Sequence, residues 1–167
     1  VDALLVSHIR YQGFQGNIRA TTRPVSFDSL ALSQILALSE FSGWRQAGGI
    51  IISDDLGSLA VRRFYDPDNA AFQVRLVARD AFLAGNDLIT LGNAVSSDAL
   101  GNYETVISAL DFFTQKYRED PAFAQRVDES VLRLLTLKFR LYDRFDLPNV
   151  LPAPDALNLV GQGGPLT

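Results

Sequence analysis

Three short apolar runs lie in the first part of the chain. They are ALLVSHI at 3–9, GGIIISDDLG at 48–57 and DLITLGN at 87–93. All three are strand-like, and the second is too short and too β-branched for a helix and apolar on both faces, as a buried parallel strand is. We therefore predict three β-strands.

The segments between these runs have the apolar spacing of helices. In 26–41 apolar residues recur at helical intervals and Ser26 can serve as the N-cap, while 70–85 has the pattern of a helix that ends at Gly85. The order strand, helix, strand, helix, strand favours parallel strands joined by right-handed crossovers. The predicted fold class is therefore α/β, as a sheet or a barrel.

Two further helices follow the third strand. They are expected over 102–120 and 121–142. Asp120 is suited to cap the second of them, because it directly precedes Pro121, and proline is favoured in the first turn of a helix.

The two ends of the chain suggest how its domain is bounded. From Pro148 onward the sequence is rich in proline and glycine, so we predict one domain over 1–145 and a linker or tail over 146–167. The chain opens on Val1 and enters a strand-like run at once. We therefore expect it to be part of a longer protein.

The composition of the 167 residues argues against several classes of function. A formal net charge of −4, with Lys and Arg scattered among acids, offers no basic surface for nucleic acid. The chain has no cysteine, which excludes disulfides, thiolate metal sites and cysteine nucleophiles. No apolar run is long enough for a membrane span. The localisation stays open.

Polar side chains gather where each predicted strand ends. His8 and Arg10 follow the first strand, Asp54 and Asp55 follow the second, and Asn93 follows the third. In parallel α/β folds the chemistry sits at the carboxyl ends of the strands, where the loops converge. These side chains therefore form the candidate site.

Structural roles compete with functional ones at these positions. A lone histidine after a strand is often a hydrogen-bonded structural residue, and acids before a helix are often caps. Side chains alternate along a strand, so Asp54 and Asp55 cannot both face one site, and one of them is expected to brace the fold. Asn86 and Asp87 lie at the amino end of the third strand, where we expect a structural role.

Four blocks of sequence carry a family resemblance through their order and spacing. They are LLVSHIRY, GGIIISDDLGSLAV, ARDAFLAGNDLITLGN and RVDESVLRLLTLKFRLY. Together they resemble the second half of the catalytic domain of glycoside hydrolase family 3, and the SDDL form is similar to its β-N-acetylhexosaminidase branch. The resemblance implies part of a (β/α)8 TIM-type barrel, about strands 6 to 8, followed by exit helices.

The resemblance also implies roles for the strand ends. Asp54, the first acid of SDDL, is similar to the family's catalytic nucleophile, and Asp55 would brace or cap the segment beside it. His8, Arg10 and Asp55 are expected at the sugar-binding site. The implied reaction is retaining hydrolysis of terminal β-linked N-acetylglucosamine, or a related β-glycoside, through a covalent glycosyl-enzyme. That reaction needs two protein groups and water, so no metal or cofactor is expected.

The chain lacks the histidine-containing segment that carries the proton donor in this branch of the family. We therefore expect the 167 residues alone not to hydrolyse glycosides appreciably. The expected partners are a carbohydrate and either the missing barrel half or another copy of the chain. Two alternatives stay open, a non-catalytic barrel remnant for sugar binding or assembly and a metal-binding α/β module. The latter would need a further acid at another strand end, whereas the third strand ends in Gly92 and Asn93.

Overall fold

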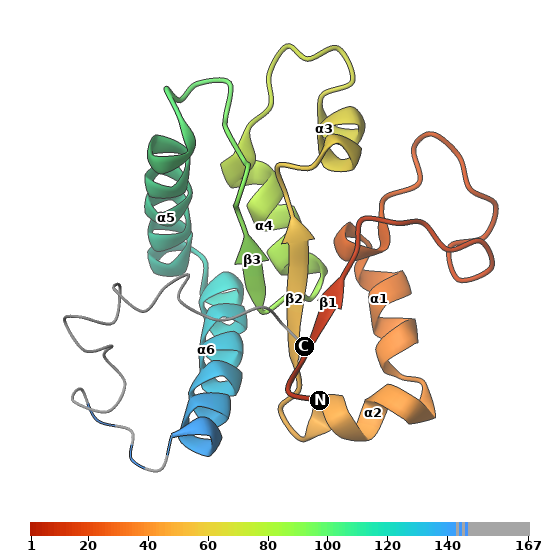
Figure 1. The fold of residues 1–167 in the computed structure, drawn as a ribbon, viewed down its shortest axis with the longest axis vertical. Helices are drawn as coiled ribbons and strands as arrows, with labels where there is room; N and C mark the ends of the chain where they lie inside the picture. The colour runs from red at the N-terminus through yellow and green to blue at the C-terminus, as the bar shows by residue number, and fades with distance from the viewer. Residues whose placement is uncertain (143, 145, 147–167) are drawn as a thin grey trace, which may run out of the picture.

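A parallel sheet of three strands lies at the centre of the protein. The computed structural model describes residues 1–142, 144 and 146. The strands are β1 (Ala3–Val6), β2 (Ile50–Asp55) and β3 (Leu88–Thr90), in the order β1-β2-β3 (Figure 1). Both neighbouring pairs are parallel. The predicted α/β class, with helices between parallel strands, is confirmed.

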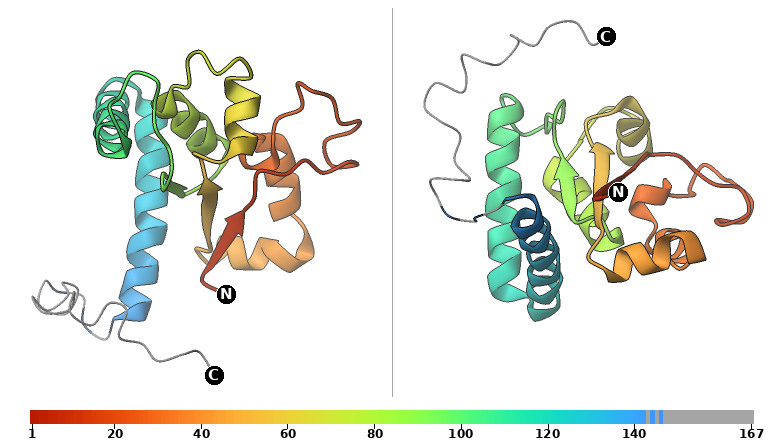
Figure 2. Two further views of the ribbon diagram at one scale, coloured as in Figure 1. Left: turned by 45° about the horizontal axis from the view of Figure 1, so that its top comes forward. Right: turned by 60° about the horizontal axis from the view of Figure 1, so that its bottom comes forward.

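The helices continue the predicted alternation and add to it. They are α1 (Ser29–Leu36), α2 (Ser39–Gln46), α3 (Leu59–Tyr65), α4 (Val74–Ala84), α5 (Asn102–Glu119) and α6 (Pro121–Leu141), and the 3-10 turn η1 (Val25–Phe27) precedes α1. Helices α1 and α2 lie on the β1 side of the sheet, and α5 and α6 lie together on the β3 side (Figure 2). In the described part of the chain, no helix has the length and apolar character needed to cross a membrane.

The segment predicted as a single helix over 26–41 forms two helices, so that prediction was wrong. The chain leaves the helical conformation at Leu38, whose ψ of 147° is extended, and α2 begins at the next residue. The break turns α2 back toward the sheet, where Trp44 packs against the apolar cluster of β1 and α1. The predicted cap was also wrong. Asp28 caps α1, because its Oδ1 accepts a hydrogen bond from the N–H of Ala31 at 3.0 Å, whereas Ser26 lies in η1.

Two predicted helix ends are confirmed. Gly85 follows α4 with a φ of 128°, a conformation that side chains disfavour. Asp120 caps α6, since its Oδ1 accepts hydrogen bonds from the N–H groups of Ala122 and Phe123, each at 3.1 Å. The sequence did not predict α3, which has only seven residues and begins after Ser58.

Helices cover one face of the sheet. Ile51 packs in an apolar cluster with α1, and Ile89 packs against the cluster that α4 contributes to. On the other face Leu5, Ile52 and Leu88 lie opposite one another across the three strands, with Leu5 58% and Leu88 37% exposed. The described residues thus leave this aliphatic row partly uncovered, although parallel sheets are usually covered on both faces.

Asp87 anchors α2 and α6 to the sheet. Its carboxylate is fully buried, pairs with Arg45, Arg126 and Arg133, and accepts a hydrogen bond from the N–H of Ile51 at 3.0 Å. Burial alone would raise the pKa of Asp87, but the hydrogen bonds from Arg45 and Ile51 and the charges of Arg45 and Arg126 outweigh it and hold the pKa below its ordinary value. The structural role expected for this residue is confirmed.

Asn86 is buried beside this cluster and is also structural. Its Nδ2 donates hydrogen bonds to the carbonyl oxygens of Ser26 at 2.8 Å and Ala81 at 2.6 Å. It thereby joins the start of β3 to η1 and α4.

The domain limits expected from the sequence fall at the end of the described chain. Apart from Asp146, the predicted tail at 146–167 lies outside the described residues. The boundary at 145 stays a prediction.

Candidate functional site

The carboxyl ends of the three strands lie at one edge of the sheet (Figure 1). His8 follows β1, Asp55 ends β2, and Asn93 follows β3. Side-chain hydrogen bonds connect all three, from His8 to the backbone of Asp55 and from Asp55 to Asn93. The fold therefore brings the sequence-predicted positions together through their side chains.

Asp55 braces two loops. Its Oδ1 accepts a hydrogen bond from the N–H of Gly57, and its Oδ2 accepts from the N–H and the Nδ2 of Asn93, each at 3.0 Å. The loop after β2 is thereby fastened to the loop after β3. The two backbones also approach closely, because a Cβ on Gly57 would lie 2.3 Å from the carbonyl carbon of Asn93. Only glycine fits at position 57 without a backbone shift.

Asp54 has far fewer bonds than its neighbour. Its side chain is half-buried, and its Oδ1 accepts a hydrogen bond from the N–H of Asp55 at 2.8 Å. Within the described residues, no second hydrogen bond and no ion pair reaches this carboxylate. Asp54 therefore keeps acceptor capacity at the end of the central strand, where a ligand could use it.

His8 fastens the end of β1 to two other segments. Its Nε2 lies 3.1 Å from the carbonyl oxygen of Asp55, and its Nδ1 lies 2.8 Å from Oγ of Ser26. A carbonyl oxygen can only accept, so Nε2 carries the proton, and in the neutral ring Nδ1 accepts from the hydroxyl of Ser26. The ring also stacks on Phe27 at a centroid distance of 5.5 Å. Both ring nitrogens are thus engaged inside the protein.

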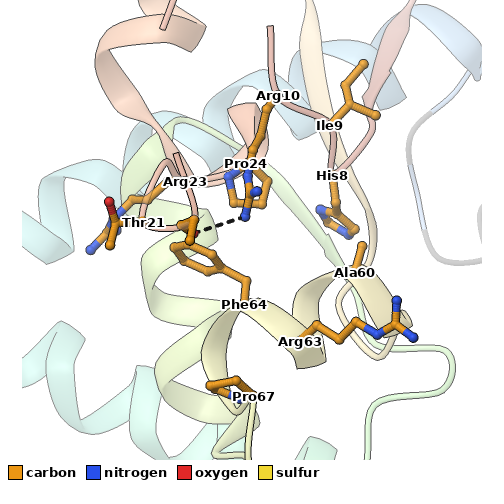
Figure 3. Close-up of a pocket in the computed structure, with 11 residues that line it drawn as sticks. His8, Ile9, Arg10, Thr21, Arg23, Pro24, Ala60, Arg63, Phe64 and Pro67 are labelled. Atoms are coloured by element: carbon orange, nitrogen blue, oxygen red, sulfur yellow. Dashed lines mark hydrogen bonds between the residues drawn. The ribbon is translucent and has the colours of Figure 1, made fainter. Parts of the chain in front are cut away.

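A cavity of about 850 Å³ lies next to these strand ends, between the 10–24 loop and α3 (Figure 3). His8 and Arg10 line it, whereas the two acids of β2 are not among the lining residues. The guanidinium of Arg10 lies over the ring of Phe64, 5.6 Å from its centroid. The expected site residues are therefore divided between the cavity and the strand end beside it.

Sequence reasoning missed the other side of this cavity. Arg63 and Phe64 line it from α3, and Arg23 lines it from the far end of the loop. The Arg-Arg-Phe run at 62–64 was the available signal. This run could not be assigned to a site, because α3 itself was not predicted.

Over residues 1–142, 144 and 146, no group of three or more His, Cys, Asp or Glu side chains is placed to hold a metal ion.

Comparisons with known proteins give a structural likeness. No protein-family model matches the chain, and no curated protein matches it. The chain is similar to part of the crystal structure of a β-N-acetylhexosaminidase from Beutenbergia cavernae DSM 12333, with a TM-score of 0.48 and 23% sequence identity over 70% of this chain. The chain spans 28% of the length of that protein.

Proposed function

We propose that the protein is the nucleophile-bearing part of a retaining β-glycosidase, and more particularly of one that removes terminal β-linked N-acetylglucosamine. Asp54 is the nucleophile. The observation that carries this proposal is the contrast between the two acids of SDDL. Among the described residues, Asp55 receives three hydrogen bonds from the loops, whereas Asp54 receives only one, from a backbone N–H.

The uncovered face of the sheet supports a barrel origin. In this proposal the strands are about the sixth to eighth of a (β/α)8 barrel, and α5 and α6 are the helices that leave it. Strand residues of such a barrel alternate between the helical layer and a packed interior. Leu5, Ile52 and Leu88 would belong to that interior, which accounts for an aliphatic row that the described helices leave exposed.

The proposed chemistry gives Asp54 one defined task. Its ionised carboxylate attacks the anomeric carbon and forms an ester, while the glycosidic C–O bond breaks and the leaving oxygen takes a proton from a separate acid. Water then hydrolyses the ester and restores the carboxylate. The sequence lacks the family's histidine-containing donor segment, so the acid would come from elsewhere, and the 167 residues alone would turn over glycosides poorly.

His8, Arg10 and Asp55 support the nucleophile in this proposal. His8 holds the backbone carbonyl of Asp55 at 3.1 Å and thereby fixes the residue next to Asp54. Asp55 holds the loops on either side. Arg10 would lie toward the sugar at the mouth of the adjoining cavity.

A mechanism-based label tests the proposal. A 5-fluoro N-acetylglucosaminyl fluoride carries a leaving group that departs without protonation, so it examines the nucleophile separately from the missing acid. We expect intact-mass analysis to show the addition of one sugar and peptide mapping to place it on Asp54.

Two variants make the result specific. Asp54→Asn should abolish the label, whereas Asp111→Asn, which removes an exposed acid on α5, should leave it unchanged. A label on Asp55 or on another residue would refute the assignment. The absence of any label on the folded chain would favour a non-catalytic barrel remnant.

A further inference from the structure

The cavity beside the strand ends has a strongly positive lining. Arg10, Arg23 and Arg63 line it, together with His8, and none of the described residues that line it is an acid. The protein as a whole carries a formal net charge of −4. A concentration of guanidinium groups around one hollow is therefore opposite in sign to the overall charge, and it would attract anions.

Few internal partners neutralise these guanidinium groups. Within the described residues, Arg63 forms no hydrogen bond, ion pair or ring contact. Arg10 contacts the ring of Phe64 and donates one long hydrogen bond, 3.5 Å, to the carbonyl oxygen of Ala20. Arg23 faces a carboxylate only at 3.8 Å, that of Asp80, and its side chain is 53% exposed.

Two arginines elsewhere in the fold illustrate closer pairing. Arg45 lies 2.5 Å from the buried carboxylate of Asp87, and Arg75 lies 2.8 Å from the exposed carboxylate of Asp98. The arginines of the cavity differ from these two in having donors that remain available to a ligand.

The shape of the lining defines where such a ligand would lie. Figure 3 shows Arg10 above the ring of Phe64, and Arg63 extending away from that ring below His8 and Ala60. Arg23 points away from this centre. The stacked ring limits the motion of the Arg10 guanidinium, so less freedom is lost when it binds.

We propose that this cavity binds a small organic anion through its carboxylate or phosphate group, held between Arg10 and Arg63. The planar guanidinium presents parallel donors that match both kinds of oxyanion. A volume of about 850 Å³ leaves room for an uncharged body beside the charged group, and the face of Phe64 supplies an apolar surface for it. This site is separate from the nucleophile, because Asp54 does not line the cavity.

A titration on the 167-residue protein tests the proposal. The ligands are inorganic phosphate, glucuronate and glucose, and binding is followed by calorimetry at low ionic strength. Glucuronate and glucose differ by the carboxylate, so glucose is the neutral control. We expect phosphate or glucuronate to bind and glucose not to bind, and we expect added sodium chloride to weaken binding. Tighter binding of one of the two anions would show whether the charged group of the ligand is a carboxylate or a phosphate.

Charge-matched variants locate the binding. Arg10→Gln and Arg63→Gln should each raise the dissociation constant about tenfold, the effect of losing one charge-assisted hydrogen bond. Arg118→Gln removes the same charge from the exposed surface of α5 and should leave the constant unchanged. Thermal unfolding without ligand checks that each variant is folded.

Other outcomes would overturn the proposal. The first is equal binding of glucose and glucuronate without any binding of phosphate. The second is no binding of either anion. The third is an equal loss of affinity in all three variants. The proposed glycosidase site does not include Arg63, so Arg63→Gln should leave the glycosyl label on Asp54 unchanged. Failure of the anion site and failure of the proposed nucleophile would therefore be seen separately.

Discussion

Nε2 of His8 donates a hydrogen bond to the backbone carbonyl oxygen of Asp55 at 3.1 Å, and this bond fastens the end of β1 to the end of β2. The other ring nitrogen is bonded to the hydroxyl of Ser26, which is fully buried. His8 is therefore a junction between two strands and the turn before α1. Its ring packs between these segments, stacked on Phe27.

This junction predicts the effect of removing the histidine. His8→Phe keeps an aromatic ring next to Phe27 but leaves the hydroxyl of Ser26 and the carbonyl of Asp55 without their partner. We expect a loss of about 1–3 kcal/mol in the free energy of unfolding, measured with urea. In a double-mutant cycle, Ser26→Ala should cost less in the His8→Phe background than in the wild type. Strictly additive effects would show that the two side chains are not coupled.

The close approach of the loops after β2 and β3 predicts a steric effect at Gly57. A Cβ there would meet the backbone of Asn93 and Ala94 at 2.3–2.5 Å. Gly57→Ala should therefore destabilise the protein by about 1–3 kcal/mol in urea unfolding. Gly43→Ala is the matched control, since Gly43 lies inside α2 with open space around it. That variant should gain about 0.5–1 kcal/mol. Equal effects of the two changes would contradict this account of the loops.

Much of the fold could be predicted because its signals are local. The β-branched run of β2, Gly85 after α4 and the cap at Asp120 each report on a few neighbouring residues, and each is found where the sequence placed it. The break between α1 and α2 could not be predicted in this way. Both halves keep helical spacing, and the packing of Trp44 against β1 is a tertiary contact.

The candidate site was less predictable for the same physical reason. Its hydrogen bonds and its cavity join segments that are far apart in the chain, such as His8 with Asp55 and Arg10 with Phe64. The alternation of side chains along β2 left open which acid would brace the fold. The register between β2 and β3 shifts between Ile52 and Asp55. Only the bonds from Gly57 and Asn93 assign the bracing role.

Asp87 predicts how stability responds to acid. Its pKa in the folded protein lies below the value of 3.8 expected for the unfolded chain. The carboxylate therefore contributes stability that is fully present above pH 3.8 and is lost as the pH falls through the folded pKa. At neutral pH, Asp87→Asn should cost about 3–5 kcal/mol, because three arginines lose their buried counter-charge.

The control for this prediction is an acid on the surface. The side chain of Asp98 pairs with Arg75 but is 49% exposed, so Asp98→Asn should change stability little. The measurement is urea unfolding of both variants and the wild type at neutral pH and near pH 3. If the difference in the free energy of unfolding between the wild type and Asp87→Asn is as large near pH 3 as at neutral pH, the pKa of Asp87 lies further below pH 3. If the two variants are equally stable at neutral pH, Asp87 does not anchor the helices.

The two acids of SDDL predict opposite outcomes for one substitution. In Asp55→Asn the side chain loses one of the oxygens that accept hydrogen bonds from Gly57 and Asn93, and its new amide can face their N–H groups. We expect a loss of about 1–3 kcal/mol in the free energy of unfolding. Asp54→Asn keeps an oxygen for the N–H of Asp55 and disturbs no other bond in the described residues. That variant should stay within about 0.5 kcal/mol of the wild type, because it touches none of the features whose loss destabilises a fold strongly.

Comparing the two variants separates stability from function. A carboxylate that the fold does not need, at the end of the central strand of a parallel sheet, is best explained by a role toward a ligand. If urea unfolding shows that Asp54→Asn costs as much as Asp55→Asn, Asp54 is a structural acid and the proposed nucleophile loses its main support. If Asp54→Asn is neutral for stability and also abolishes the glycosyl label, the same carboxylate is dispensable for the fold and required for the chemistry.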